Sequence, residues 1–114
     1  MRLQRLCRLD EIPEGEAKGF AIEAPDGRLE ILVYRDGDAV FGYVNSCPHV
    51  GSPLDWAPDR FIAPDGYHLI CATHGAIFRP TDGYCVNGPC AGDSLRRAPV
   101  RLHGGDVVYD HEPS

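Results

Sequence analysis

The chain has 114 residues, of which 43% are hydrophobic, a length that suits one small domain with a core of its own. Its formal net charge is −6, and its eleven Lys and Arg residues are scattered apart from the pair Arg96 and Arg97. This charge argues against nucleic-acid binding, which needs clustered positive charge to neutralise phosphates. Thirteen Gly and ten Pro predict many turns between short segments, and we therefore expect a mostly β protein.

The N-terminal segment has Arg2, Arg5 and Arg8, with acidic residues from Asp10 onward, so it lacks the apolar core of a signal peptide. No later run approaches the roughly eighteen apolar residues that a membrane-spanning helix needs. We therefore expect a cytoplasmic protein without a membrane partner. In a reducing compartment, five cysteines are more often metal ligands or buried thiols than disulfides.

Strand patterns begin near the N-terminus. Residues 2–9 (RLQRLCRL) alternate polar and apolar side chains, which predicts a strand. Residues 27–34 and 39–44 are both β-rich, and the Asp-Gly pair between them is a strong hairpin signal. The inward side chains of the first strand are expected to be Leu3, Leu6 or Cys7, and Leu9.

The second half of the chain continues the same pattern. Residues 66–73 (GYHLICAT) predict a strand, and residues 75–86 predict two short strands around a turn at Asp82 and Gly83. Residues 98–110 predict a last hairpin with two central glycines. No segment shows helical periodicity, and no repeat or linker is present. We therefore predict one all-β domain over residues 1–114.

Two loops each carry one cysteine and one histidine. Cys47 and His49 are one residue apart, and Cys71 and His74 are two residues apart. A tetrahedral zinc site would accept these ligands, but its usual order groups Cys with Cys and His with His. A [2Fe–2S] cluster explains the alternating order, because each loop can send one ligand to each of the two irons. Both kinds of metal site fit the residue types.

The sequence CPHVGSPLDW followed by CATHGAIF resembles the Rieske iron–sulfur signature, in which Cys-x-His precedes Cys-x-x-His. In that family the second box continues as His-Gly-x-x-Phe, then an acidic-Gly turn and a Gly-Pro loop. This chain has HGAIFRPTDG and then NGPC, so the resemblance extends from about Val44 to Cys90. It implies an all-β fold of antiparallel sheets in a β sandwich, with a small cluster-binding subdomain over about residues 45–90.

The resemblance also implies a cofactor and a function. One [2Fe–2S] cluster per chain is expected, with Cys47 and Cys71 on one iron and His49 and His74 on the other. The chain is then an electron carrier and not an enzyme, and it has no catalytic residues. It would be a ferredoxin that accepts one electron from a flavin or NAD(P)H-linked reductase and passes it to an oxygenase or another redox acceptor.

This chain departs from the family pattern in the interval from His49 to Cys71, which is several residues longer than the commonest spacing. The extra residues are predicted to be a loop insertion, DRFIAPDGYH, within residues 55–68. Its role is left open. Two alternative functions also stay open: the small subunit of a nitrite-reductase-like complex, which commonly lacks the ligands, and a zinc-binding structural module.

Respiratory-chain Rieske proteins differ from this chain beyond the four ligands. They carry one further Cys in each loop, joined as a disulfide, where this chain has Ser52 and Thr73. They also place a Ser and a Tyr after the last His, and the hydroxyls of these residues donate hydrogen bonds to sulfur atoms. Here the corresponding residues are Ala76 and Phe78, which implies a cluster of low reduction potential.

The remaining cysteines and histidines receive separate predictions. Cys85 and Cys90 are five positions apart and form either two thiols, a disulfide or a redox relay. We expect thiols, because a reducing cytoplasm disfavours a disulfide. Cys7 is expected in the core. The other histidines are expected at the surface or in hydrogen bonds, not in a mononuclear iron site, and they are His68, His103 and His111.

Overall fold

The structure is a computed structural model that describes residues 3–24, 27–46, 48, 54–55, 60–71, 75–88 and 90–111. The described elements are ten strands and one short 3-10 helix, η1 (Leu9–Glu11). Within these residues no helix is long and apolar enough to cross a membrane. The strands are β1 (Leu3–Arg8), β2 (Ala17–Ala24), β3 (Gly27–Asp36), β4 (Ala39–Val44), β5 (Leu69–Ile70), β6 (Ile77–Phe78), β7 (Cys85–Asn87), β8 (Arg97–Ala98), β9 (Val100–His103) and β10 (Asp106–Asp110).

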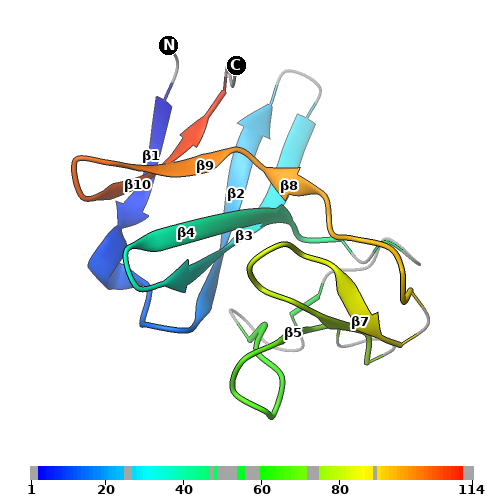
Figure 1. Cartoon of the computed structure of the whole chain (residues 1–114). Helices are drawn as coiled ribbons and strands as arrows, with labels where there is room; N and C mark the ends of the chain where they lie inside the picture. Colours follow the sequence, from blue (N-terminus) through cyan, green and yellow to red (C-terminus); the bar gives the residue numbers. More distant parts are fainter. Residues whose placement is uncertain are drawn as a thin grey trace.

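The strands form three antiparallel sheets, which confirms the predicted all-β fold (Figure 1). One sheet has the order β1-β10-β9, the second has the order β2-β3-β4-β8, and a small sheet has the order β5-β6-β7. In Figure 1, the small sheet lies at the end of the molecule opposite both chain termini. The predicted C-terminal hairpin is confirmed as β9 and β10, which pair from His103 and Asp106 to Val100 and Tyr109.

β3 is an interior strand of the second sheet, and its four consecutive residues Ile31 to Tyr34 are all buried. Successive side chains of a strand point to opposite faces, so Ile31 and Val33 share one face, and Leu32 and Tyr34 share the other. The first face contributes to the sandwich core, made of Cys7, Ile12, Ile22, Ile31, Val33, Ala98 and Val107. The other face contributes to the loop-side core, made of Ala17, Leu32, Tyr34, Tyr43, Leu54, Phe61, Leu69, Cys71, Ala76, Phe78, Cys85, Cys90 and Leu95.

The turn between β3 and β4 confirms the predicted hairpin. Asp36 pairs with Ala39, so that the turn consists of two residues, and Gly37 has a φ of +61°, which favours glycine. The carboxylate of Glu14 accepts hydrogen bonds from the Gly37 N–H at 3.0 and 2.9 Å. These bonds attach the segment before β2 to the hairpin.

The sequence pattern did not predict β2, which pairs with β3 from Ala17 and Tyr34 to Ala24 and Gly27. Its sequence, AKGFAIEA, contains only two large apolar residues, and so its local strand signal is weak. The long partner strand supplies the hydrogen bonds that hold it extended. β2 therefore depends on pairing rather than on its own composition.

The first strand contains an irregularity that explains its mixed pattern. The register of β1 against β10 shifts between Arg5 and Cys7, as in a β-bulge. Cys7 is buried in the sandwich core, as predicted, and Leu6 packs against the same core although it directly precedes Cys7 in the chain. The bulge therefore lets two consecutive side chains contact one core.

The insertion forms a short hairpin rather than a simple loop. Phe61 is buried in the loop-side core, and its carbonyl accepts a hydrogen bond from the Ile70 N–H at 2.9 Å. The Ala63 N–H donates to the His68 carbonyl at 2.7 Å. The predicted strand over residues 66–73 was therefore too long, because residues 64–68 form a turn and β5 begins at Leu69.

Tyr43 connects the second sheet to the small sheet. Its side chain is fully buried, and its hydroxyl donates a hydrogen bond to the Pro80 carbonyl at 2.8 Å. Pro80 lies in the turn between β6 and β7, where Gly83 has a φ of +75°. A Cβ atom on Gly83 would lie 2.8 Å from the Tyr43 ring, so the turn needs glycine for both space and backbone conformation.

We predict that Tyr43→Phe lowers the free energy of unfolding by about 1–3 kcal/mol, because the buried Pro80 carbonyl loses its donor. Urea denaturation measures this change. The matched control is Tyr84→Phe, since Tyr84 lies in the same region with 39% of its surface exposed, and there we expect little effect. Equal losses in the two variants would contradict a specific role for the Tyr43 hydroxyl.

A second prediction concerns alkaline pH. Burial raises the pKa of Tyr43 from 10.0 to about 12, so the folded state holds the phenolic proton more tightly than the unfolded chain does. The stability that this proton contributes is fully present below pH 10 and is lost as pH rises toward about 12. The stability difference between wild type and Tyr43→Phe should therefore shrink over this range in urea titrations. A constant difference would contradict the prediction.

Candidate metal centre

The first ligand loop is closed at its base by Asn45, which follows β4. The Asn45 side-chain N–H donates to Asp55 Oδ1 at 3.1 Å, and its Oδ1 accepts from the Leu54 N–H at 2.7 Å. Leu54 is fully buried in the loop-side core. The two ends of the loop are therefore fixed side by side. Between them, the predicted ligands Cys47 and His49 lie outside the described residues.

The second ligand loop continues the hairpin of β5 and β6. Cys71 donates its backbone N–H to the Ala76 carbonyl at 2.9 Å, and its carbonyl accepts from the Gly75 N–H at 2.8 Å. Gly75 has a φ of +68°, a conformation that suits glycine in a tight turn. Cys71 is thereby fixed by backbone hydrogen bonds. His74 and Thr73 lie outside the described residues.

A third loop, which connects β7 to Cys90, packs directly against the second at Gly88. A Cβ atom built on Gly88 would lie 2.7 Å from the Ala76 Cα, so only glycine permits this approach. Gly88 also has a φ of +105°, which other residues rarely adopt. Gly88 belongs to the Gly-Pro pair that the resemblance identified in the sequence. Pro89 lies outside the described residues.

The three loops meet in one core. The loop-side core includes one residue of the first loop, two of the second and two that flank the third. The shared core brings together segments that are far apart in the sequence. Those residues are Leu54, Cys71, Ala76, Cys85 and Cys90.

Of the four predicted ligands, the structure describes Cys71, and this residue fits a metal centre. Cys71 is completely buried and is a thiol in the structure. A thiolate is costly to bury unless a cation lies beside it, and an iron ion supplies that charge. Within the described part of the chain, no group of three or more His, Cys, Asp and Glu side chains forms a metal site, and three of the four predicted ligands lie outside that part.

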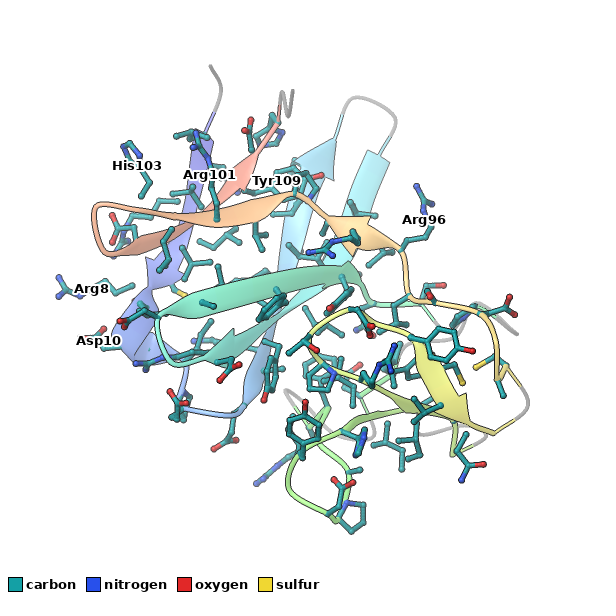
Figure 2. The ribbon with its side chains drawn as sticks, in the orientation of Figure 1. Arg8, Asp10, Arg96, Arg101, His103 and Tyr109 are labelled. Atoms are coloured by element: carbon teal, nitrogen blue, oxygen red, sulfur yellow. The ribbon has the colours of Figure 1, made fainter. Side chains whose placement is uncertain are left out.

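Two of the other histidines are hydrogen-bonded to side chains. His68 Nδ1 lies 2.6 Å from Asp65 Oδ2, and His111 Nε2 lies 2.9 Å from Gln4 Oε1. Figure 2 shows His103 on the part of the sandwich remote from the small sheet. These positions agree with the expectation of surface or hydrogen-bonded histidines.

The carboxylate of Asp65 organises the turn of the insertion, a role that the sequence did not reveal. It accepts hydrogen bonds from the backbone N–H groups of Tyr67 and His68 as well as from the His68 ring. These bonds, with the one from the Tyr67 N–H contributing most, lower the pKa of Asp65 to about 2. The Asp-Gly pair in the sequence is the signal that marks this turn.

Comparison with known proteins assigns the family. A family model described as the Rieske [2Fe-2S] domain matches residues 2–101. The chain is 26% identical over 110 residues to the biphenyl dioxygenase ferredoxin subunit of Pseudomonas sp. (strain KKS102), covering 96% of this chain and 93% of that protein.

Two solved structures have a similar fold. The Sphingomonas yanoikuyae B1 ferredoxin has a TM-score of 0.70 and 26% identity, and the match covers 98% of this chain and all of that one. A chain in the complex of reduced oxygenase and oxidised ferredoxin in carbazole 1,9a-dioxygenase has a TM-score of 0.72 and 21% identity, over 98% of this chain and 95% of that chain. Because the family model spans most of the sequence and the fold agrees, this protein belongs to the Rieske [2Fe-2S] domain family and carries one [2Fe–2S] cluster.

Proposed function

We propose that this protein is the ferredoxin of an oxygenase system and that Cys47, His49, Cys71 and His74 hold its [2Fe–2S] cluster. When bound, the cluster accepts and releases one electron. The observation that carries this proposal is the meeting of three loops in one core around the buried Cys71. The cluster-binding subdomain would be about residues 45–90 within the single domain 1–114.

The extent of the match supports a carrier rather than an enzyme. The chain matches 93% of the biphenyl dioxygenase ferredoxin subunit and all of the Sphingomonas yanoikuyae B1 ferredoxin, and both of these proteins are named as ferredoxins. The protein fixes the loops that hold the cluster through backbone hydrogen bonds and close packing. Such a rigid frame suits electron transfer, because few atoms need to move when the charge of the site changes.

The proposed electron acceptor is an oxygenase. The biphenyl relative is named as a ferredoxin subunit of a dioxygenase, and a ferredoxin of similar fold occurs with its oxygenase in the carbazole system. The proposed donor is a flavin or NAD(P)H-linked reductase. The proposed location of the protein is the cytoplasm. The zinc module and the nitrite-reductase-like subunit are less well supported, because the similar proteins are iron–sulfur ferredoxins of dioxygenases.

Two positions in the hairpin of β5 and β6 support a low reduction potential. Ala76 and Phe78 are both fully buried, and neither carries a hydroxyl group. The respiratory-chain Rieske proteins that this sequence resembles have hydroxyls at these positions, and those hydroxyls favour the electron-rich reduced state. Without them, the midpoint potential should lie toward the low end of the roughly −150 to +300 mV range of Rieske centres. A reductase linked to a flavin or NAD(P)H can reduce a cluster of low potential.

Metal analysis tests the function together with one ligand. We expect about two irons and two acid-labile sulfides per chain, together with the EPR signal of a reduced Rieske centre. Cys71→Ser should abolish the signal and the transfer of electrons from reductase to oxygenase, because the iron loses a thiolate ligand. The control is Cys7→Ser. Because Cys7 is buried in the separate sandwich core, this substitution should leave the cluster intact. One zinc per chain, or an unchanged spectrum in Cys71→Ser, would overturn the proposal.

The potential itself gives a further prediction. Ala76→Ser combined with Phe78→Tyr should raise the midpoint potential, if the new hydroxyls donate to sulfur atoms and stabilise the reduced state. Each such bond is worth ~1.5–3 kcal/mol, which corresponds to about 60–130 mV for one electron. Protein-film voltammetry measures the shift, and Ala98→Ser in the sandwich core is the control. A wild-type value above about +150 mV would contradict the argument from missing hydroxyls.

A further inference from the structure

Two cysteines outside the predicted ligand set lie against each other beneath the third loop. The Sγ atoms of Cys85 and Cys90 are 3.1 Å apart, and the two residues are 0% and 2% exposed. Both are present as thiols in the structure. The third cysteine outside the predicted ligands, Cys7, belongs to the separate sandwich core and does not share this arrangement. The contact between Cys85 and Cys90 is therefore a local feature of the third loop.

Hydrogen bonding orients the two sulfur atoms toward each other. Cys85 Sγ lies 3.2 Å from the Asn87 carbonyl and donates its single thiol proton to it. The contact between the two sulfurs is also within hydrogen-bond distance at 3.1 Å, and a sulfur atom can accept as well as donate. The two sulfur atoms therefore lie side by side.

The backbone keeps both cysteines in place. The Cys85 N–H donates to the Asp93 carbonyl at 2.8 Å, and the Asp93 N–H donates to the Cys90 carbonyl at 2.9 Å. The backbones of both cysteines are thus hydrogen-bonded to Asp93. A disulfide has a sulfur–sulfur distance of about 2.05 Å, so the two sulfur atoms need to approach by only about 1 Å. Small side-chain rotations can supply this movement without opening the fold.

The chain around this pair is exposed to solvent, since Asn87, Gly88 and Ala91 are all exposed. Cys90 retains 2% of its surface exposed, whereas Cys85 is fully buried. The reaction proposed below is therefore assigned to begin at Cys90.

We propose that Cys85 and Cys90 are an oxidisable dithiol, which hydrogen peroxide converts into an intramolecular disulfide across the third loop. The Cys90 sulfur attacks one peroxide oxygen, the O–O bond breaks, and a sulfenic acid and one water form. The Cys85 sulfur then displaces the hydroxyl group as a second water, and the S–S bond forms. One peroxide is reduced to two waters, and the two thiols lose two electrons and two protons. A dithiol reductant reverses the reaction by exchange.

The position of the pair gives the bridge a structural consequence. Gly88 lies between the two cysteines and contacts Ala76 of the second ligand loop. A disulfide would restrict the turn that rests on this loop. The inference goes beyond the proposed electron transfer, because the reaction of the two sulfur atoms does not require the cluster.

The test uses the holoprotein, reduced with dithiothreitol, desalted without oxygen and exposed to one equivalent of hydrogen peroxide. After denaturation in an alkylating agent, a protease that cuts before aspartate releases residues 82–92, which contain only Cys85 and Cys90. We expect this peptide to be unlabelled and two hydrogens lighter, while the other three of the five cysteines are alkylated. Dithiothreitol added before alkylation should restore both labels.

Matched variants separate this bridge from general oxidation. Cys7→Ser should form the same bridged peptide, whereas Cys85→Ser and Cys90→Ser should form none. Full labelling of the wild-type peptide after peroxide, a sulfinic acid in place of the bridge, or a disulfide that includes Cys47 or Cys71 would overturn the proposal. Cluster absorbance in the same samples reports on the proposed function separately, since loss of the cluster and formation of the bridge have different readouts.

Discussion

The burial of β3 on both faces is the constraint on which the rest of this structure depends. Ile31 and Val33 fill the sandwich core, while Leu32 and Tyr34 fill the loop-side core. The same strand therefore supports both halves of the molecule. Tyr43 of β4, which pairs with Leu32 of β3, extends the second face to the small sheet through its hydrogen bond to the Pro80 carbonyl. The ligand loops are thus built on a sheet whose opposite face is packed against the sandwich core.

Backbone contacts and turns hold the site more than polar side chains do. The second loop is closed by hydrogen bonds between Cys71, Gly75 and Ala76, and the third rests on it because Gly88 has no Cβ atom. Among the described residues of the first loop, the Asn45 side chain closes the loop through hydrogen bonds to Asp55 and Leu54. Short hairpins with few rotatable groups limit the movement of a metal site when its charge changes.

The proposed ligand set and the loop-side core share a residue. Cys71 is both a predicted ligand and a buried member of this core, so iron bound to Cys71 as proposed would also stabilise the packing of the core. The surface ion pairs contribute less to the stability of the fold. Arg5 with Asp106 and Arg28 with Glu30 are largely exposed pairs, which water and salt screen. Stability therefore comes mainly from the two cores.

The sequence was sufficient for the family and for the hairpins that turn at Gly37 and at residues 104–105. The four ligands stay predictions. Those features rest on local signals, because ligand spacing and turn residues can be recognised within a few positions. The strand β2 could not be predicted from the sequence, since its strand conformation comes from pairing with β3. The burial of Phe61 and the 3.1 Å contact between Cys85 and Cys90 also depend on how distant segments pack. Packing of this kind is decided by three-dimensional contacts, which no short stretch of sequence contains.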